Sequence, residues 1–552
     1  MDHFKQIGPQ LFYSFPLQEE EKNKLVSFLE ILETSGVWKY IPESRETDQQ
    51  GRPPYNPYSL FAAILLGFSI GKASLREIES SCKNDLRFIF IVGISTPSYA
   101  TISRFIQKVI TPNREAIFAC IMEAIFTRCT LNMDTVFLDG TKQQAKANKY
   151  KFVWKPTVFH ERLSDKIRAL LKTLGLEKDV PATGFVPAVL IMKKIEVMAR
   201  LDPQQINGGE KALSAMRNNL SQYLLKTVEY EEKEEICGPN RRSYYKTDHD
   251  ATAMCLKQDY YSGLGSNMHA AYSAQILVAQ GFIVSYLISQ NRTDLYTLKP
   301  TIECFRSMYG KYPSKLVADS GYGNLENYTY CEQKGIEAFV KYQAWNGESS
   351  GRNPAIYELL ENGNIRCLGG REGRVVELKS RHPKKAGAVF YLIKNCTGCD
   401  FMPYCRRYMA EKEGAEKYFE IQRDFVRLKQ KARDLLLTPE GIEMRVNRSC
   451  QVEGAFGIIK QDMLYTRFRR TSMPRVTTEF ALTCLGMNMR KFMRFSVDKK
   501  IPKYWIAPDD LVHGTFKKPS AKRLANRVNK KRLKQPNEIV RSPTKKRSVQ
   551  NS

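Results

Sequence analysis

Two short apolar segments, each ending in an aspartate with a glycine close behind it, constrain the fold of this chain most. TVFLDGTKQ covers residues 135–143 and SKLVADSGYG covers residues 314–323. Each pattern predicts a buried β-strand, with Asp139 and Asp319 at the two carboxyl ends. A sheet edge holds such an acid rigidly, at a place where ligands and metals collect. The pattern therefore predicts an α/β fold with a candidate site at these strand ends.

The charge of the chain indicates its class of partner. Lys and Arg number 86 against 58 Asp and Glu, which gives a formal net charge of +28. A surplus of that size points to a polyanion, and to nucleic acid before any other. The alternative is a basic surface that is merely solvated. The 552 residues predict about three domains, and the 42% of apolar residues exclude a wholly disordered chain.

No segment has the character of a membrane span or a secretory signal. The longest apolar stretch, from Leu60 to Gly71, has 12 residues, whereas a helix needs about 20 to cross lipid. The N-terminus, MDHFKQIGPQLFYSF, lacks a basic segment followed by an apolar core. Together with 13 Cys in a chain of this length, these features predict a cytoplasmic protein with reduced thiols.

Residues 1–130 are predicted to be helical. Helices are expected over 58–70, 74–83 and 98–110, and Ser74 and Ser98 stand where an N-cap would.

The last of these helices, in SYATISRFIQKV, carries Arg104, Gln107 and Lys108 among small residues. A helix–turn–helix would place it in a DNA major groove, whereas an ordinary three-helix bundle with a polar face explains the pattern equally well. Arg104 and Lys108 are therefore candidate DNA contacts.

The remaining composition changes divide the rest of the chain. AAYSAQILVAQGFIVSYLISQ, residues 270–290, predicts two strands around a Gln280–Gly281 turn. Residues of about 160–245 form a polar, helix-rich insertion whose charge runs are expected on solvated helix faces. From Leu511 to Ser552 there are 13 Lys or Arg and a single acid, which predicts a disordered tail that binds phosphates without reading sequence.

A third acid lies in a predicted helix near the C-terminus. Glu453 stands in RSCQVEGAFGIIKQD, and Lys460 follows it by seven residues, two turns along the same face. Gly454 and Gly457 cost a helix about 1 kcal/mol each, so we expect them to permit close approach of another backbone or of DNA.

Three converging carboxylates suit hard cations. Mg²⁺ takes one or two carboxylates together with water and substrate phosphate, and two ions ~3.5–4 Å apart clamp the attacking and leaving oxygens of a phosphoryl displacement. Asp139, Asp319 and Glu453 are therefore candidate ligands of two Mg²⁺ (or Mn²⁺) ions. Asp248 and Asp250, in TDHDATAM, are rival acids by composition.

Several motifs in a fixed order make the chain resemble a known family. The chain resembles bacterial insertion-sequence transposases of the DDE type, within the IS4/IS5-like class and most similar to the IS1182 family, from about residue 50 to about residue 495. The segments that carry this resemblance are GRPPYNPYSLFAAILLGF, TISRFIQ, FLDGTKQQAKANKYKFVW, TDHDATAMCLKQD, VADSGYGNLENY and VEGAFGIIKQDMLYTRFRR.

The resemblance implies an RNase H-like fold, a mixed sheet flanked by helices, with an Asp-Asp-Glu triad. Asp139 matches the D-G-T element, Asp319 the D-x-G-Y element, and Glu453 with Lys460 the E-x6-K helix. The hairpin would supply the second and third strands, beside the first.

This resemblance also implies a domain plan. An all-α DNA-binding domain with a helix–turn–helix-like arrangement would occupy 1–130, and the catalytic domain 131–497. The catalytic domain would hold the helical insertion at about 160–245 and a Cys-containing insertion at about 340–440, and a basic tail would follow over 498–552.

Two features depart from the wider class. An Arg often precedes the Glu by four residues, but Ser449 stands there and Arg448 lies one place further back, which leaves the role of Arg448 a guess. Asp319 and Glu453 are 134 residues apart (453 − 319), so an insertion must separate the last core strand from the catalytic helix.

That insertion carries a cysteine cluster. Cys396, Cys399 and Cys405 form C-x2-C-x5-C, and Cys367 stands alone upstream. Four thiolates would make a closed structural Zn²⁺ site. The alternative is four reduced, partly buried cysteines.

Basic and aromatic residues alternate after Lys460, in YTRFRRTSMPR. Arg467, Arg469 and Arg470 are candidate DNA contacts, because the guanidinium fork binds two phosphate oxygens and aromatics stack on unpaired bases. A solvated basic surface competes with this interpretation.

The sequence as a whole predicts a transposase that cleaves double-stranded DNA at the terminal inverted repeats of an insertion sequence and joins the 3′ end to target DNA. A homodimer assembled on DNA, associated with the bacterial nucleoid, is expected by the family analogy. The alternative is a non-catalytic DNA-binding protein, either inactive or domesticated. A nuclease without strand transfer would use the same metal site.

Overall fold

The computed structural model divides the chain into two compact units. It describes residues 17–42, 55–93, 96–239, 241–264, 267–378, 387–406, 416–498, 506, 520–524 and 526. The first unit comprises Met1–Pro313 with Arg448–Tyr504, and the second comprises Ser314–Asn447 with Trp505–Ser552. The plan of three domains rests on the family resemblance, whereas these two units are defined by packing, so the plan remains a prediction.

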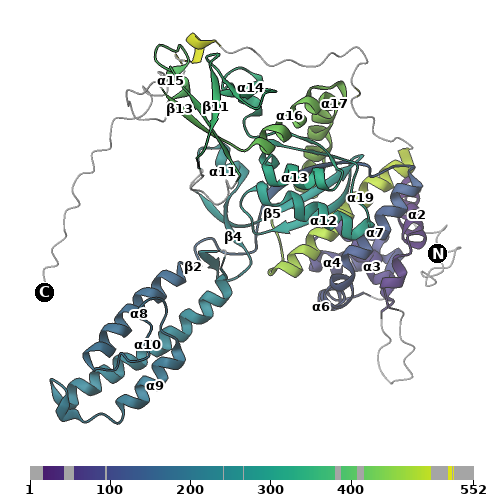
Figure 1. The fold of residues 1–552 in the computed structure, drawn as a ribbon. Helices are drawn as coiled ribbons and strands as arrows, with labels where there is room; N and C mark the ends of the chain where they lie inside the picture. Colours follow the sequence, from purple (N-terminus) through teal and green to yellow (C-terminus); the bar gives the residue numbers. More distant parts are fainter. Residues whose placement is uncertain are drawn as a thin grey trace, which may run out of the picture. The chain divides into compact units, whose positions relative to one another are not determined.

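The first unit begins with helices, as predicted (Figure 1). The expected helices 58–70 and 74–83 are confirmed as α3 and α4, and Ser74 caps α4 in a capping box with Glu77. The elements are α2 (Glu19–Thr34), η2 (Val37–Tyr40), α3 (Pro57–Ser69), α4 (Leu75–Asn84), α5 (Leu86–Val92), α6 (Tyr99–Phe105), η3 (Ile106–Ile110) and α7 (Thr111–Arg128).

The helix predicted over 98–110 begins at Tyr99, capped by Ser98, but its predicted end is wrong. It continues through the π-helical turn η3 into α7. Pro112 lies just beyond the predicted end, and proline lacks an N–H and clashes with the preceding turn of a helix. The wider π turn accommodates it, and the Thr111 hydroxyl and the Asn113 amide donate to the carbonyls of Ile106 and Val109 at 2.9 and 3.0 Å.

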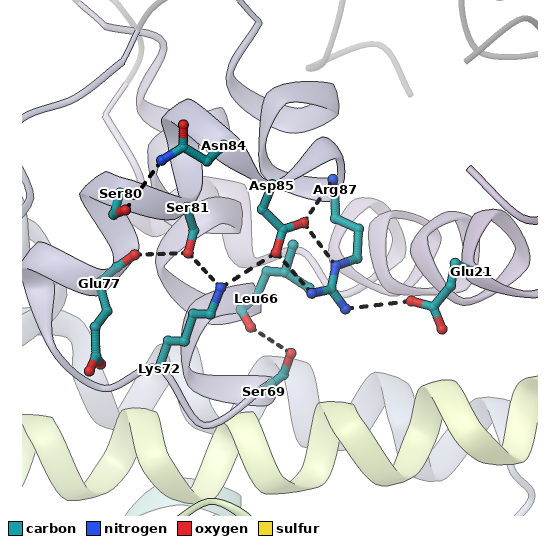
Figure 2. A network of polar contacts seen from close by, with 10 residues as sticks. All are labelled: Glu21, Leu66, Ser69, Lys72, Glu77, Ser80, Ser81, Asn84, Asp85 and Arg87. Atoms are coloured by element: carbon teal, nitrogen blue, oxygen red, sulfur yellow. Dashed lines mark hydrogen bonds and ion pairs between the residues drawn. The ribbon is translucent and has the colours of Figure 1, made fainter. Parts of the chain in front are cut away.

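A polar network joins three of the N-terminal helices (Figure 2). The Arg87 guanidinium contacts Asp85 through two nitrogens, at 3.0 and 2.9 Å, and reaches Glu21 of α2 at 3.5 Å. Lys72 donates to the Ser81 hydroxyl at 2.8 Å and pairs with Asp85 at 3.5 Å. Burial acts to raise the pKa of Asp85, but the bonds and charge of Arg87 outweigh it, and this pKa lies below its ordinary value.

The sheet of the first unit is antiparallel. The long central strand β5 pairs with β1 along one edge, and with β4 and then β6 along the other. The predicted hairpin is confirmed: Gln280 and Gly281 both have positive φ, at 49° and 79°, as a tight two-residue turn requires. The elements are β1 (Thr135–Gln144), β4 (Thr252–Cys255), β5 (Met268–Ala279), β6 (Phe282–Ser289), α11 (Lys257–Tyr261), η5 (Asp294–Tyr296) and α12 (Leu298–Tyr309).

The last helix, α19 (Met473–Asp498), joins the N-terminal helices to this sheet. It packs against α3 and α2 and also against β6. A Cβ at Gly486 would lie 2.6 Å from the carbonyl carbon of Phe68 in α3, so only glycine permits this close approach. The buried Asn488 amide accepts from Ile283 N at 2.9 Å and donates to Ile283 O at 2.7 Å in β6. The N-terminal helices therefore share one core with the sheet.

The residues predicted as a helical insertion, about 160–245, form a helical bundle with its own apolar core (Figure 1). Helices α8 and α10 lie side by side, and α9 packs on α10. The short strands β2 and β3 pair at the foot of the bundle. The elements are β2 (Phe152–Trp154), α8 (Pro156–Thr173), α9 (Ala188–Met198), η4 (Pro203–Gln205), α10 (Gly209–Cys237) and β3 (Ser243–Tyr245).

The second unit contains a parallel strand pair, β7 with β8, and an antiparallel five-stranded sheet in the order β13-β12-β11-β10-β9. The second predicted Asp-ending strand is thus confirmed as β7. The elements are β7 (Lys315–Ala318), η6 (Ser320–Tyr322), α13 (Leu325–Gln333), β8 (Glu337–Val340), α14 (Trp345–Ser349), β9 (Tyr357–Leu359), β10 (Ile365–Cys367), β11 (Glu372–Val376), β12 (Val389–Ile393), α15 (Met402–Cys405), β13 (Lys417–Ile421), α16 (Arg423–Leu437) and α17 (Pro439–Arg448).

Both units combine helices with sheets, and parallel and antiparallel pairing both occur, so the fold is mixed α/β as predicted. Most of the predicted basic tail lies outside the described residues. Leu524, which belongs to the described part, is 1% exposed and packs against Tyr404 in the second unit. Within the described ranges, no helix is both long enough and apolar enough to span a bilayer.

Candidate functional site

Asp139 lies on β1 with both carboxylate oxygens engaged. Oδ1 accepts from the Gly140 N–H at 2.8 Å, and Oδ2 lies 3.2 Å from Nη1 of Arg448. The side chain keeps 27% of its surface exposed, against 13% for Arg448. From the sequence, the role of Arg448 was only a guess. The structure makes it the cation paired with Asp139, across 309 positions of sequence.

Gly140, the glycine of the D-G-T motif, is required by the packing of the sheet. It stands opposite Gln275 in the β1–β5 ladder. A Cβ at position 140 would lie 2.1 Å from Nε2 of Gln275. The Gln275 amide is fully buried, and it donates to the Ser273 hydroxyl at 2.9 Å and to Asp294 at 3.1 Å. The Gln275 side chain therefore crosses β1 directly beside Asp139.

The segment that follows Arg448 carries Glu453 and Lys460. It comprises a π-helical turn η8 (Ser449–Glu453), α18 (Gly454–Gly457) and a second π-helical turn η9 (Ile458–Asp462). The prediction of a helix here is confirmed, but two of its turns are π-helical. Glu453 and Lys460 each lie in a π turn, a conformation frequent at functional sites.

Three side chains hold this segment against the sheet. Besides the Arg448–Asp139 ion pair, the buried Gln451 accepts from Gly281 N at 2.9 Å in the β5–β6 turn. At the far end, the Lys460 ammonium donates to the Thr141 hydroxyl at 2.5 Å. The segment is thus fixed along β1, from Asp139 to Thr141.

Lys460 lies in a basic and partly buried environment. Burial lowers the pKa of its ammonium, and the charge of Lys257 lowers it further, while Asp139 acts to raise it. An anion beside Lys460 would stabilise the charged ammonium, because an opposite charge offsets the loss of water on burial. The position therefore favours a bound anion.

Glu453 takes no part in these contacts. Its side chain is exposed, and among the residues that the structure describes it has no hydrogen-bond or ion-pair partner. Among the described residues, a Cβ at Gly454 or at Gly457 would meet no atom within 4 Å. The two glycines are therefore not needed for packing within the chain, and the surface beside Glu453 is open to a ligand.

Asp319 belongs to the second unit. It follows β7, and its Oδ1 accepts from Ser320 N at 2.7 Å, as Asp139 accepts from Gly140. The loop behind it is tightly fixed, because a Cβ at Gly323 would lie 2.3 Å from the carbonyl oxygen of Lys341. Convergence of Asp319 with Asp139 and Glu453 remains a prediction.

The rival acids Asp248 and Asp250 serve another purpose. Asp248 is 1% exposed and accepts from the Tyr272 hydroxyl at 2.8 Å and from Ser472 N at 3.1 Å. Asp250 accepts from Met473 N at 2.6 Å. These bonds satisfy free N–H groups at the start of α19, where a helix dipole favours negative charge. Composition made these two acids rival candidates for the metal-binding carboxylates, but in the structure they cap the start of α19.

Of the Arg residues predicted to contact DNA, three also make structural contacts, and one of these contacts is the ion pair of Arg469 with Glu77 at 3.3 Å. Arg467 donates to the carbonyl of Ala145 at 3.0 Å, beside the end of β1. Arg470 pairs at 3.5 Å with the fully buried Glu479, which also accepts from the Tyr465 hydroxyl and from the N–H groups of Arg469 and Arg470, each at 2.9 Å. Glu479 therefore fixes the backbone of the basic segment at Arg469 and Arg470.

The basic segment after Lys460 lines a groove in the first unit, which is called the basic groove below. The groove has a volume of about 540 Å³, and five of its lining residues are basic and none is acidic. The predicted contacts Arg469 and Arg470 line it beside Ser103 and Gln107 of α6 and η3; the nearby Arg104 and Lys108 are exposed but do not line it. Its other basic residues, which the sequence interpretation missed, are Arg76, Lys146 and Arg475.

Little in the sequence could have identified these three residues as neighbours. Lys146 lies in a lysine-rich run, QQAKANKYK, which was an available signal. Arg76 and Arg475 are about 400 positions apart, and only the packing of α19 on α3 brings their segments together.

The four predicted zinc ligands do meet, around a cavity of about 20 Å³ in the second unit that Cys367, Cys396, Cys399 and Cys405 all line. Yet within the described ranges no three His, Cys, Asp or Glu side chains converge as a metal ion requires. The Lys417 ammonium, which donates to Sγ of Cys405 at 3.0 Å, already places a cation at one thiol. The prediction of Zn²⁺ is therefore not supported.

Comparison with known families gave two matches. Residues 16–108 match a family model described as a transposase domain (DUF772), and residues 367–493 match one described as a transposase DDE domain. The second match includes Glu453 and Lys460, whereas Asp139 and Asp319 lie outside both. Comparisons with curated proteins and with solved structures gave no match.

Proposed function

Because the chain belongs to the DDE transposases, with the two domains typical of the IS1182 family, we propose that it cleaves DNA at the ends of an insertion sequence and joins the freed 3′ end to target DNA. Asp139, Asp319 and Glu453 would be the catalytic carboxylates. The observation that carries the proposal is the contact of Arg448 and Lys460 with β1, which fixes the Glu453 segment along the strand that holds Asp139.

The donor set fits two divalent cations. Asp139 and Glu453 offer the oxygen ligands that Mg²⁺ and Mn²⁺ prefer, and Glu453 has a carboxylate that no described side chain occupies. Bound there, such ions would activate the attacking oxygen and stabilise the leaving oxygen of a phosphoryl transfer. Arg448 holds Asp139 in place at one oxygen, and Lys460 would anchor a phosphate.

The basic groove would hold the DNA. Arg76, Lys146 and Arg475 would contact a phosphate backbone, and Gln107 adds an amide that can contact it. Arg469 can join them from its ion pair with Glu77, whereas both Nη atoms of Arg470 are buried. Phosphate contacts of this kind position a duplex without reading its sequence. The terminal inverted repeats and target DNA would be the partners, with a homodimer assembled on the two ends.

The test is cleavage of labelled element-end DNA with and without Mg²⁺, alongside a binding assay without metal. Glu453→Gln and Asp139→Asn should lose cleavage and keep end binding within about threefold, because neither acid lies in the groove. Asp462→Asn, an exposed acid in the same segment, is the matched control and should cut normally. Persistent cutting by Glu453→Gln would refute the triad. Binding by the wild-type chain with no cutting under any metal would support the non-catalytic alternative.

A further inference from the structure

The two-stranded ribbon β2–β3 exposes aromatic side chains that the proposed chemistry does not use. Phe152 and Trp154 alternate along β2 and so share a face, and they are 47% and 55% exposed. Phe152 stands opposite Tyr245, at a ring distance of 6.1 Å, but Trp154 stands opposite the small Ser243. No larger ring therefore covers the indole from the partner strand, although burying an aromatic side chain is normally favourable.

Cations flank these aromatic residues at both ends of the ribbon. Lys246 N donates to Lys151 O at 3.1 Å, and Lys155 N donates to Arg242 O at 2.7 Å. Each bond brings two basic residues of opposite strands together, one pair beyond Phe152 and the other beyond Trp154. Like charges that face each other destabilise a strand pair, so an anion between them would stabilise the ribbon.

The surrounding sequence strengthens this charge. Between Gly140 and His160 there are five Lys and no acid. The exposed Lys146 and Lys151 belong to this run, and the Lys155 ammonium lies 4.4 Å from the centre of the Trp154 ring. Basic and aromatic side chains that alternate in this way suit a chain of phosphates and bases.

We propose that the β2–β3 ribbon binds unpaired nucleotides of single-stranded DNA, with Trp154 and Phe152 stacked on bases and the flanking Lys and Arg residues on phosphates. This proposal rests on the proposed function, since DNA is the substrate there. Stacking requires the face of a base, which a paired duplex covers with its neighbours. The ribbon therefore selects unpaired strands, whereas the basic groove holds paired DNA.

Tryptophan emission provides a direct readout. The chain has four Trp, of which Trp38 and Trp345 are 9% and 4% exposed. In a Trp505→Phe background, Trp154 is the exposed indole among the described residues, and a stacked base quenches indole emission. The experiment titrates the full-length chain, carrying Glu453→Gln and without metal, with single-stranded oligothymidylate and with a blunt duplex of equal length.

We expect the single strand to quench the emission, and Trp154→Phe to remove the quenching while keeping most of the affinity. The double variant Phe152→Ala/Trp154→Ala should weaken single-strand binding at least tenfold, since one stacked base is worth about 5- to 150-fold. Its duplex affinity should change less than twofold. Tyr260→Ala, which removes an aromatic residue that is 71% exposed elsewhere in the unit, is the matched control and should leave both affinities unchanged.

Two results would overturn the proposal. One is an equal loss of duplex and single-strand affinity in the double variant. The other is a change in Trp154 emission with protein concentration alone, which would show that a second copy of the chain covers the ribbon. Because cleavage is switched off throughout, failure here would leave the proposed catalytic site untouched, and failure of the cleavage test would leave single-strand binding untouched.

Discussion

Replacing Gly140 with alanine tests whether the position of Asp139 depends on the packing of the sheet beneath it. The added Cβ would lie 2.1 Å from Nε2 of Gln275 and 2.6 Å from its Cδ, and real Cβ atoms do not approach so closely. The side chain of Gln275 must therefore leave its place. In doing so it would give up its hydrogen bonds to Ser273 and Asp294.

The cost follows from these interactions. Overpacking of a well-packed core costs about 1–3 kcal/mol. The two hydrogen bonds of the buried amide add about 0.5–1.5 kcal/mol each. We therefore expect Gly140→Ala to lower the stability of the β1–β5 pair by about 2–6 kcal/mol. At 1.4 kcal/mol per factor of ten, local opening of this strand pair becomes at least about 25-fold more frequent.

Hydrogen exchange followed by mass spectrometry measures that opening locally, which suits a chain of two units that need not unfold together. Peptides of β1 and β5 should exchange faster in Gly140→Ala. Adding Gln275→Ala should restore part of the protection, because it removes the clashing amide. Exchange in Gly140→Ala within threefold of the wild-type rate would refute this explanation of the D-G-T glycine.

Three further predictions concern the open surface beside Glu453, the basic groove and a partly buried lysine. Gly454→Ala and Gly457→Ala, where a Cβ meets open space, should stabilise the free chain by up to about 1 kcal/mol each in thermal unfolding, yet reduce end cleavage about tenfold if DNA lies against that surface. Arg475→Gln should lower the slope of log affinity against log salt by about 0.9 for each phosphate that the variant no longer neutralises, whereas Lys211→Gln on α10 should leave the slope unchanged. Burial lowers the pKa of Lys491 from 10.5 to about 8, so the folded chain binds fewer protons than the unfolded chain between these values, and stability rises as pH rises through them. Lys491→Met should lack this gain of roughly 3 kcal/mol between pH 7 and pH 11 in urea unfolding, and an unchanged pH dependence would contradict the assignment.

The Arg448–Asp139 ion pair sets a condition on how the proposed site works. The guanidinium occupies one carboxylate oxygen of Asp139, and the Gly140 N–H occupies the other. A cation that binds Asp139 must therefore share an oxygen with one of these donors or displace it. Arg448 consequently acts as a positioning residue, and its charge also balances Asp139 in the free chain.

The elements of this fold were largely predictable, because their signals are local. Short apolar runs marked β1, β5, β6 and β7, and capping serines marked the starts of α4 and α6. Helical periodicity and polar composition marked the insertion. The end of the helix predicted over 98–110 was misplaced, because the chain stays helical through the π turn η3 into α7, where two side-chain donors accommodate Pro112.

The role of each polar residue could not be predicted in the same way, because it depends on partners that lie far away in the sequence. Composition could not separate Asp139 from Asp248, because both are acids beside apolar strands. One pairs with Arg448 and keeps part of its surface exposed, and the other is buried at the start of α19. The cysteine spacing indicated zinc, but the placement of Lys417 beside Cys405 argues against it.

The sequence by itself determined the strands and helices, the motif order and the excess of positive charge, since periodicity, capping and composition act over a few residues. Only the tertiary structure decided that Arg448 pairs with Asp139 and that Arg76 and Arg475 line one groove. It also decided that Gln275 makes Gly140 indispensable. Each of these depends on contacts between segments far apart in the chain, which form only when the core packs.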